Sequence, residues 1–154
     1  MTDSLHIMPV ADAEAWEAVR AIRQRVFVDE QACPPEEEWD AHDWPEDHGR
    51  TCRHLLALAD RRPVGTARWR AVSWNGKEWA KLERFAVLPH ARGLGYGRAL
   101  VQAAMADARA AGHARLMLSA QDHLRSFYAA WGFQPRGEVF MEAGIPHVKM
   151  TLDA

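Results

Sequence analysis

The pattern of apolar positions in the first part of the chain predicts one short strand and one helix. Leu5 and Ile7 alternate with polar residues and, with Pro9-Val10, suggest an opening strand. Apolar side chains then recur every three or four positions, as on one face of a helix: Trp16, Val19, Ile22 and Val26. Asp12 precedes this run and is a residue type that caps helices, so we expect the helix to begin directly after it.

Three further apolar runs predict neighbouring strands of a sheet. They cover 54–59, 64–72 and 78–88. Arg61-Arg62-Pro63 separates the first two, and Asn75-Gly76 separates the second from the third. Asn-Gly is the dipeptide most typical of a two-residue hairpin, so we expect these strands to pair in an antiparallel way.

The remainder of the chain alternates helices with strands. The spacing of apolar residues and of glycines predicts, in order, a helix at 95–111, a strand at 115–119, a helix at 122–131 and strands near 138–142 and 147–152. A strand, a glycine turn, a helix and a second strand form a βαβ unit, so part of the sheet should be parallel. The predicted fold class is therefore α/β, with a mixed (α+β-like) sheet of six to seven strands flanked by helices.

Length and charge restrict the class of protein. A chain of 154 residues fits a single domain covering 1–154. The formal net charge of −2 does not suggest a nucleic-acid partner, and no apolar stretch approaches the roughly 20 residues of a membrane span. The two cysteines, Cys33 and Cys52, lack the Cys-x-x-Cys spacing of zinc and redox sites, and the N-terminus lacks the pattern of a signal peptide. We expect a reduced, cytoplasmic protein without a metal.

The segment from Arg92 to Gly97 has the composition of an anion-binding turn. It joins a strand to a helix and carries glycines at 93, 95 and 97, between Arg92 and Arg98. A helix N-terminus offers unpaired N–H groups, and glycines let the backbone approach a phosphate closely. The spacing is neither that of a P-loop nor that of the Gly-x-Gly-x-x-Gly dinucleotide fingerprint. A pyrophosphate on an extended cofactor fits the pattern, and a tight strand-to-helix turn is the alternative.

Two motifs in this order resemble the GNAT superfamily of N-acetyltransferases. The superfamily's pyrophosphate loop, Arg/Gln-x-x-Gly-x-Gly/Ala after a strand ending in Val-x-Pro, is matched by Val87-Leu88-Pro89 and then by Arg92, Gly95 and Gly97. Its second motif, Tyr-x-x-x-Gly-Phe at the end of a helix, is matched at 128–133. Segments at 26–31, 33–34, 137–140 and 144–147 are similar to the ElaA-like branch of the superfamily.

The resemblance implies a GNAT-like acyl-CoA N-acyltransferase fold and acetyl-CoA as co-substrate. The cofactor would lie in a wedge between two splayed strands, around 85–88 and 116–119. Backbone groups of Phe85 and Val87 would pair with the pantetheine arm. The residues implied to hold the rest of the cofactor are Arg92, Gly93, Leu94, Gly95, Gly97, Arg98 and Gln121. Gln121 replaces the asparagine that many members carry near the last helix. Many members also pair through sheet edges, which leaves a homodimer open.

The residues that would carry the chemistry each have a structural alternative. Tyr128 matches the superfamily's general-acid tyrosine, and a protonated phenol suits a departing thiolate. It also lies on an apolar helical stripe, where it would be a core residue. An alkyl ammonium must lose a proton before it attacks, and Glu83 and His147 are the candidate bases. For Glu83 the alternative is an ion pair with a neighbour such as Arg84. For His147 the alternative is a structural role as a hydrogen-bonded histidine.

The acidic stretch from about 29 to 49 carries no clear chemistry. It contains carboxylates and histidines in a row: Asp40, His42, Asp43, Glu46, Asp47 and His48. We expect a solvated loop here. Metal binding and attraction of a cationic amine are the other interpretations.

The sequence as a whole predicts an N-acetyltransferase that passes an acetyl group to a primary amine of a small molecule or peptide by direct attack. A non-catalytic acyl-CoA-binding module is the alternative, and a nucleotide-binding protein is a weaker one.

Overall fold

The computed structural model describes residues 4–44 and 51–153. Its strands are β1 (Leu5–Pro9), β2 (Cys52–Ala59), β3 (Arg62–Trp74), β4 (Lys77–Val87), β5 (Arg115–Gln121), β6 (Gln134–Glu142) and β7 (Ile145–Asp153). Its α-helices are α1 (Ala13–Arg23), α2 (Pro35–Glu38), α3 (Tyr96–Ala110) and α4 (Arg125–Ala129). A π-helix, Gln24–Glu30, continues α1, and short 3₁₀ turns stand at Pro89–Ala91 and Asp122–Leu124.

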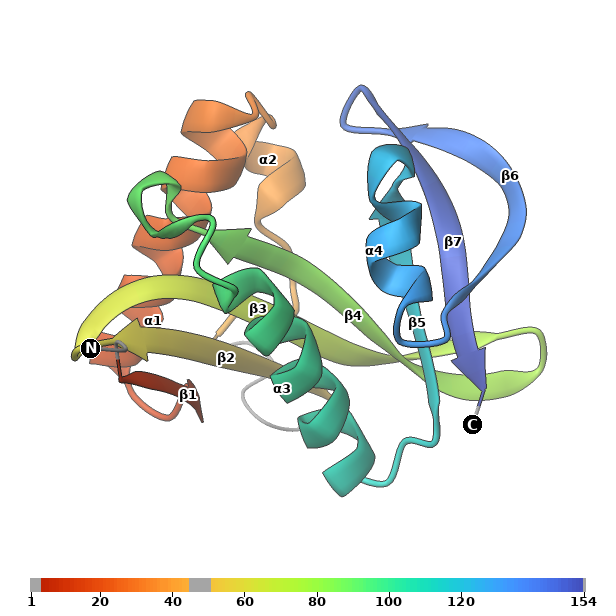
Figure 1. Ribbon diagram of the computed structural model, residues 1–154, viewed down its shortest axis with the longest axis horizontal. Coiled ribbons are helices and arrows are strands. Elements are labelled where there is room, and N and C mark those ends of the chain that lie inside the picture. Colours follow the sequence, from red (N-terminus) through yellow and green to blue (C-terminus); the bar gives the residue numbers. More distant parts are fainter. Residues whose placement is uncertain (1–3, 45–50, 154) are drawn as a thin grey trace.

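The described strands form one mixed sheet of seven strands in the order β1-β2-β3-β4-β5-β7-β6. Figure 1 shows α1 on one face of this sheet and α3 on the other. Each helix covers its own apolar cluster: one is centred on Val19 and Ile22 of α1, the other on Leu100 and Ala104 of α3. The predicted class, a mixed sheet flanked by helices, is confirmed.

The sheet opens between β4 and β5. These two strands run parallel, and they pair only at Ala80↔Leu116 and Lys81↔Met117. Beyond this point the strands diverge, as Figure 1 shows for their upper halves. All other neighbouring strands in the sheet are antiparallel.

A bulge interrupts β4 where the strands diverge. Arg84 has a φ of +57°, and the pairing with β3 shifts from Thr66↔Ala86 to Arg68↔Glu83. Two residues of β4 therefore oppose one residue of β3, which is the definition of a β-bulge. A left-handed backbone is costly for a residue with a Cβ, so the surrounding structure must hold Arg84 in it.

The N-terminal helix begins as the sequence predicts and ends differently. The carboxylate of Asp12 accepts a hydrogen bond of 2.8 Å from the Ala15 N–H, which confirms the cap. After Arg23 the chain widens into the π-helix, closed by a hydrogen bond of 3.1 Å from the Gln31 N–H to the Val26 carbonyl. The apolar spacing had predicted an ordinary helix through Val26. π-helical turns are rare in proteins, and those that occur are often found at functional sites.

The later elements agree with prediction, with small differences at their ends. Asn75 and Gly76 have positive φ values of 54° and 75°, as the predicted hairpin requires. The helix predicted at 122–131 is instead a 3₁₀ turn followed by α4, which ends at Ala129. The last hairpin turns at Ala143-Gly144, one residue earlier than predicted. None of the helices in the described ranges is long and apolar enough to cross a membrane.

Candidate active site

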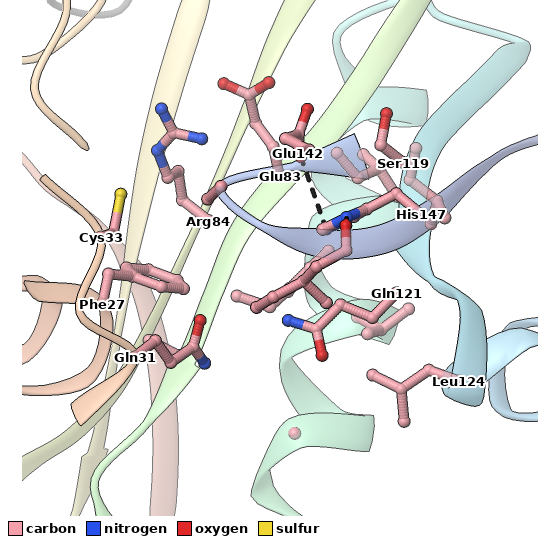
Figure 2. A pocket seen from close by; sticks show the side chains of 18 of the residues that line it. Phe27, Gln31, Cys33, Glu83, Arg84, Ser119, Gln121, Leu124, Glu142 and His147 are labelled. Atoms are coloured by element: carbon pink, nitrogen blue, oxygen red, sulfur yellow. Dashed lines mark hydrogen bonds and ion pairs between the residues drawn. The ribbon is translucent and has the colours of Figure 1, made fainter. Parts of the chain in front are cut away.

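A cavity of about 510 Å³ lies where β4 and β5 separate. Four parts of the chain form its walls. They are the diverging halves of β4 and β5 with the start of α3, the segment from the π-helix to α2, the 3₁₀ turn and α4 that carry Leu124 and Tyr128, and the turn between β6 and β7. Figure 2 shows Phe27, Gln31 and Cys33 on one side and Gln121 and His147 on the other. Of the residues we predicted for the site, seven line this cavity: Glu83, Phe85, Val87, Gly97, Gln121, Tyr128 and His147.

The backbone of β4 presents polar groups to the cavity. The Leu88 N–H donates to the Val64 carbonyl on the β3 side, at 2.8 Å. Because N–H and C=O groups alternate in direction along a strand, those of Phe85 and Val87 point the other way, toward β5. No strand pairing reaches them there, since the pairs to β5 end at Lys81. An extended ligand can therefore pair with this edge as a strand would.

The glycine turn stands at the N-terminus of α3, beside the cavity. Gly93 and Gly95 have φ values of 81° and 84°, a conformation that disfavours any other residue type, and Gly95 caps the helix. A Cβ placed on Gly97 would meet only Val87 Cγ2, at 3.9 Å. The first N–H groups of α3 lack helical partners, so the turn offers donors and free space that suit an anion.

The two arginines of the turn already have partners. Arg92 forms an ion pair with Glu30 at the end of the π-helix, and its Nε donates to the Val87 carbonyl at 3.0 Å. Arg98 lies over the rings of Phe127 and Trp131, with 5.6 and 5.4 Å from its Cζ to their centroids. The other predicted cofactor-binding residues of the turn and of the helix start do not line the cavity; they are Arg92, Gly93, Leu94, Gly95 and Arg98.

Tyr128 combines the two properties that the sequence left as alternatives. It belongs to the main apolar cluster with only 8% of its surface exposed, and it also lines the cavity. Burial raises its pKa to about 12. Its hydroxyl makes no hydrogen bond to any residue in the described ranges. A buried, protonated donor without a partner is thus available to a ligand.

His147 is held in one orientation by its own strand. Its Nδ1 atom lies 2.7 Å from the Ile145 carbonyl oxygen, which can only accept, so Nδ1 carries the hydrogen. Nε2 lies 3.5 Å from a carboxylate oxygen of Glu142, the contact drawn dashed in Figure 2. In the neutral ring Nε2 is therefore the basic atom, and the side chain that bears it lines the cavity.

Glu83 is bound by cations, but not by the one we expected. Its carboxylate forms ion pairs with Arg68, Arg70 and Lys81, whereas its neighbour Arg84 pairs with Glu38 and Asp40. Burial works against ionisation of Glu83, yet the charges of Arg68 and Arg70 outweigh it and keep its pKa below the ordinary value. A carboxylate stabilised in this way is a weak base.

The described part of the acidic stretch is only partly the solvated loop that we expected, because Glu36 and Glu37 are exposed whereas Glu38 and Asp43 are buried. Arg23 and Arg68 are each 1% exposed, and they bind Glu38, Asp40 and Asp43 of this stretch. Hydrogen bonds and the charge of Arg68 outweigh the burial of Asp40 and hold its pKa well below the usual range. Burial outweighs Arg23 and Arg84 at Glu38, whose pKa is raised. This buried charge network fixes one wall of the cavity, because Glu38 lines it.

Glu46, Asp47 and His48 of the acidic stretch lie outside the described residues. Within residues 4–44 and 51–153, no group of three His, Cys, Asp or Glu side chains is placed to hold a metal ion. Cys33 and Cys52 are not joined to each other by a disulfide.

Several lining residues were not predicted. Phe27, Gln31 and Cys33 come from the π-helix wall, and Ser119 comes from the diverging part of β5. Gln31 and Cys33 lie in the segment that resembles the ElaA-like branch, which was the only sequence signal for them. Burial, with help from the nearby Glu38, raises the pKa of the Cys33 thiol, so it is mainly unionised.

The fold and the site are those of the acyl-CoA N-acyltransferase class. In this class two parallel strands separate, a cavity lies where they part, and a glycine turn stands at the start of a helix beside it. The model of the acetyltransferase (GNAT) domain matches residues 25–154. The chain therefore belongs to the GNAT acetyltransferase family and is an acyltransferase.

Individual relatives agree with this assignment. A Bacillus subtilis protein whose name describes it as an acetyltransferase is 41% identical over 130 residues, which cover 84% of each chain. An acyl-CoA N-acyltransferase from Pseudomonas aeruginosa has the same fold, with a TM-score of 0.82, 27% identity and coverage of 97% of this chain and 99% of that one. Escherichia coli ElaA matches with a TM-score of 0.78, 27% identity and the same coverage, in line with the ElaA-like resemblance.

Proposed function

We propose that the protein transfers the acetyl group of acetyl-CoA to the nitrogen of a primary amine on a small molecule or peptide. The observation that carries this proposal is the meeting of two groups in one cavity. The hydroxyl of Tyr128, which has no hydrogen-bond partner among the described residues, lines the cavity beside the edge of β4. The imidazole of His147, with its tautomer fixed, lines the same space.

The residues around the cavity fit an acyl-CoA. The N–H and C=O groups of Phe85 and Val87 would pair with the amides of the pantetheine arm, with Gln121 opposite them on β5. The N–H groups of Gly93, Leu94, Gly95, Gly97 and Arg98 would hold the pyrophosphate, because they lie at the free N-terminus of α3. Arg92 would add positive charge next to it. Acetyl-CoA supplies the thioester whose carbonyl carbon the amine attacks.

His147 is the base that the geometry favours. An alkyl amine arrives as an ammonium ion and must give up a proton before it can attack. Nε2 of His147 is a free acceptor in the cavity, whereas the charges of Arg68 and Arg70 lower the pKa of Glu83. Imidazole is also the side chain that ordinarily titrates nearest to neutral pH.

Tyr128 is the donor to the leaving group. Its pKa of about 12 keeps it protonated, and this value exceeds the roughly 8.5 of a thiol. The hydroxyl therefore stabilises the thiolate by a hydrogen bond and passes its proton on only as a proton from the amine replaces it.

The atoms and protons balance. The ammonium gives one proton to His147 Nε2, the C–N bond forms and the C–S bond breaks. The thiolate takes the Tyr128 proton, the second proton of the amine returns to the Tyr128 oxygen, and His147 releases its proton to water. The net products are an N-acetyl amine, CoA thiol and one proton.

The test is a thiol-release assay with acetyl-CoA and a panel of primary amines, in which mass spectrometry identifies the product. We expect CoA release that depends on the amine and an N-acetyl product in equal amount. Binding of acetyl-CoA without product from any amine would instead support the non-catalytic acyl-CoA-binding alternative.

A further inference from the structure

Glu142 lies beside His147, and among the described residues its carboxylate forms no ion pair with an arginine or lysine. It ends β6, and its partner in the ladder is Ile145, while His147 pairs with Phe140. Residues two apart in a strand share a face, so Glu142 and His147 are diagonal neighbours on the same face of the hairpin. Glu142 and His147 both line the cavity, as Figure 2 shows.

Arginines or lysines neutralise two of the four acids that line the cavity. Glu38 is bound by Arg23 and Arg84, and Glu83 by Arg68, Arg70 and Lys81. For Glu37 and Glu142 the described residues provide no such ion pair. Glu37 stands on α2, on the opposite wall, while Glu142 contacts His147.

The contact between Glu142 and His147 brings two acceptors together. Because Nδ1 donates to Ile145, Nε2 of the neutral ring carries no hydrogen, and it lies 3.5 Å from Oε2 of Glu142. Two acceptors at this separation repel each other unless a donor lies between them. An ammonium group has three N–H bonds and a positive charge, so it can donate to both at once. A hydroxyl has one donor, and an aryl amine lacks the charge.

We propose that Glu142 Oε2 and His147 Nε2 together bind the ammonium group of the acceptor, so that protonated alkyl amines are the preferred substrate class. Glu142 acts as the specificity residue, and it stabilises the imidazolium that forms when the proton moves to Nε2. This inference rests on the proposed function, because it concerns the acceptor side of the same reaction.

The experiment measures ligand binding by the His147 ring directly. The ring nitrogens are followed by NMR in the CoA-bound protein and assigned with a His147→Gln variant. Phenethylammonium and 2-phenylethanol are titrated as probes of nearly equal shape that differ in charge. We expect a saturable shift with the ammonium and none with the alcohol. In Glu142→Gln the ammonium should bind roughly tenfold more weakly, the lower range for a charge-assisted hydrogen bond.

Two matched variants separate a contact from a general effect of charge. Glu138→Gln removes the same charge from the same strand outside the cavity, and should bind like the wild type. Glu37→Gln removes the unpaired acid of the opposite wall, and should weaken binding far less than Glu142→Gln does. An equal loss in Glu37→Gln, equal affinity for the alcohol, or no ammonium binding in the wild type would each overturn the inference.

Because this readout needs no turnover, it is independent of the proposed reaction. If no amine is acetylated but the binding contrast holds, the proposed function fails while the ammonium site stands. If amines are acetylated but Glu142→Gln has no selective effect on protonated alkyl amines, the reaction stands and the ammonium site fails.

Discussion

Arg92 of the glycine turn and Glu30 at the end of the π-helix form a two-pronged ion pair, with two N–O distances of 2.6 Å. The pair joins the predicted pyrophosphate loop to the wall that the π-helix forms. The hydrogen bond and charge of Arg92 lower the pKa of Glu30, so this carboxylate remains charged beside the anion site. In the proposed complex, CoA and Glu30 would share Arg92.

The first prediction concerns this competition. Glu30→Gln should strengthen CoA binding about twofold to fivefold, because a negative charge leaves the phosphate site and the pair is partly exposed. Arg92→Gln should weaken it. Calorimetric titration at two salt concentrations checks both, and Glu138→Gln on β6 serves as the control for net charge. Weaker binding in Glu30→Gln would mean that the pair orients the turn instead of competing for it.

Gly97 provides a second prediction, in which stability and binding should change in opposite directions. It lies in the first turn of α3, and a Cβ would meet only Val87 Cγ2 at 3.9 Å. Gly97→Ala should thus fold normally and raise the free energy of unfolding by about 0.5–1 kcal/mol. The new methyl group would project into the space for the cofactor, so CoA should bind at least tenfold more weakly. Unfolding curves and CoA titration measure the two effects, and unchanged CoA affinity would remove the turn from the binding site.

Glu83 should behave as a structural acid. Glu83→Gln leaves Arg68 buried without one of its counter-charges, which should lower the free energy of unfolding by about 3 kcal/mol. Amine-dependent transfer should persist in the folded part of this variant and be lost in His147→Gln, because His147 is the proposed base. Loss of transfer in folded Glu83→Gln, with retention in His147→Gln, would identify Glu83 as the base after all.

His54 makes stability depend on pH. It is 4% exposed, its Nε2 lies 3.1 Å from the His42 carbonyl, and burial lowers its pKa from 6.5 to about 4. Between these two pKa values His54 is protonated in the unfolded chain and neutral in the folded protein. The free energy of unfolding therefore falls as the pH drops from about 6.5 to 4. This single group accounts for a loss of about 3 kcal/mol.

Denaturation of His54→Gln across this pH range tests the assignment. The stability difference between wild type and variant should shrink by about 3 kcal/mol from pH 7 to pH 4. His6→Gln, at an exposed position of β1, is the control and should give a curve parallel to that of the wild type. A parallel curve for His54→Gln as well would place the acid sensitivity elsewhere.

Local chemistry made several elements predictable from the sequence. Asp12 caps α1 and Asn75-Gly76 forms a hairpin because these residue types favour those backbone states whatever surrounds them. Gly97, Gln121, Tyr128 and His147 could be proposed for one site because the motifs fixed their places along the strands and helices. Their meeting in one cavity then followed from the order of the elements.

The parts that escaped prediction depend on contacts between distant segments. The π-helix at Gln24–Glu30 has the same apolar spacing as an ordinary helix, so its wider turn left no trace in the pattern. Arg84 adopts a positive φ because of its register against β3, which no local signal encodes. Glu38 and Asp43 are buried only because Arg23 and Arg68, on α1 and β3, meet them there.

The most direct test of the account is the single-turnover rate of Tyr128→Phe. Acetyl-CoA and an accepted amine are mixed with excess protein, and the N-acetyl product is followed by mass spectrometry. Because the hydroxyl has no partner in the described ranges, the variant should unfold at the wild-type midpoint and bind acetyl-CoA equally well. The transfer step should slow by about a hundredfold or more. An unchanged rate in the folded, CoA-bound variant would contradict the assignment of Tyr128 as the donor to the leaving thiolate.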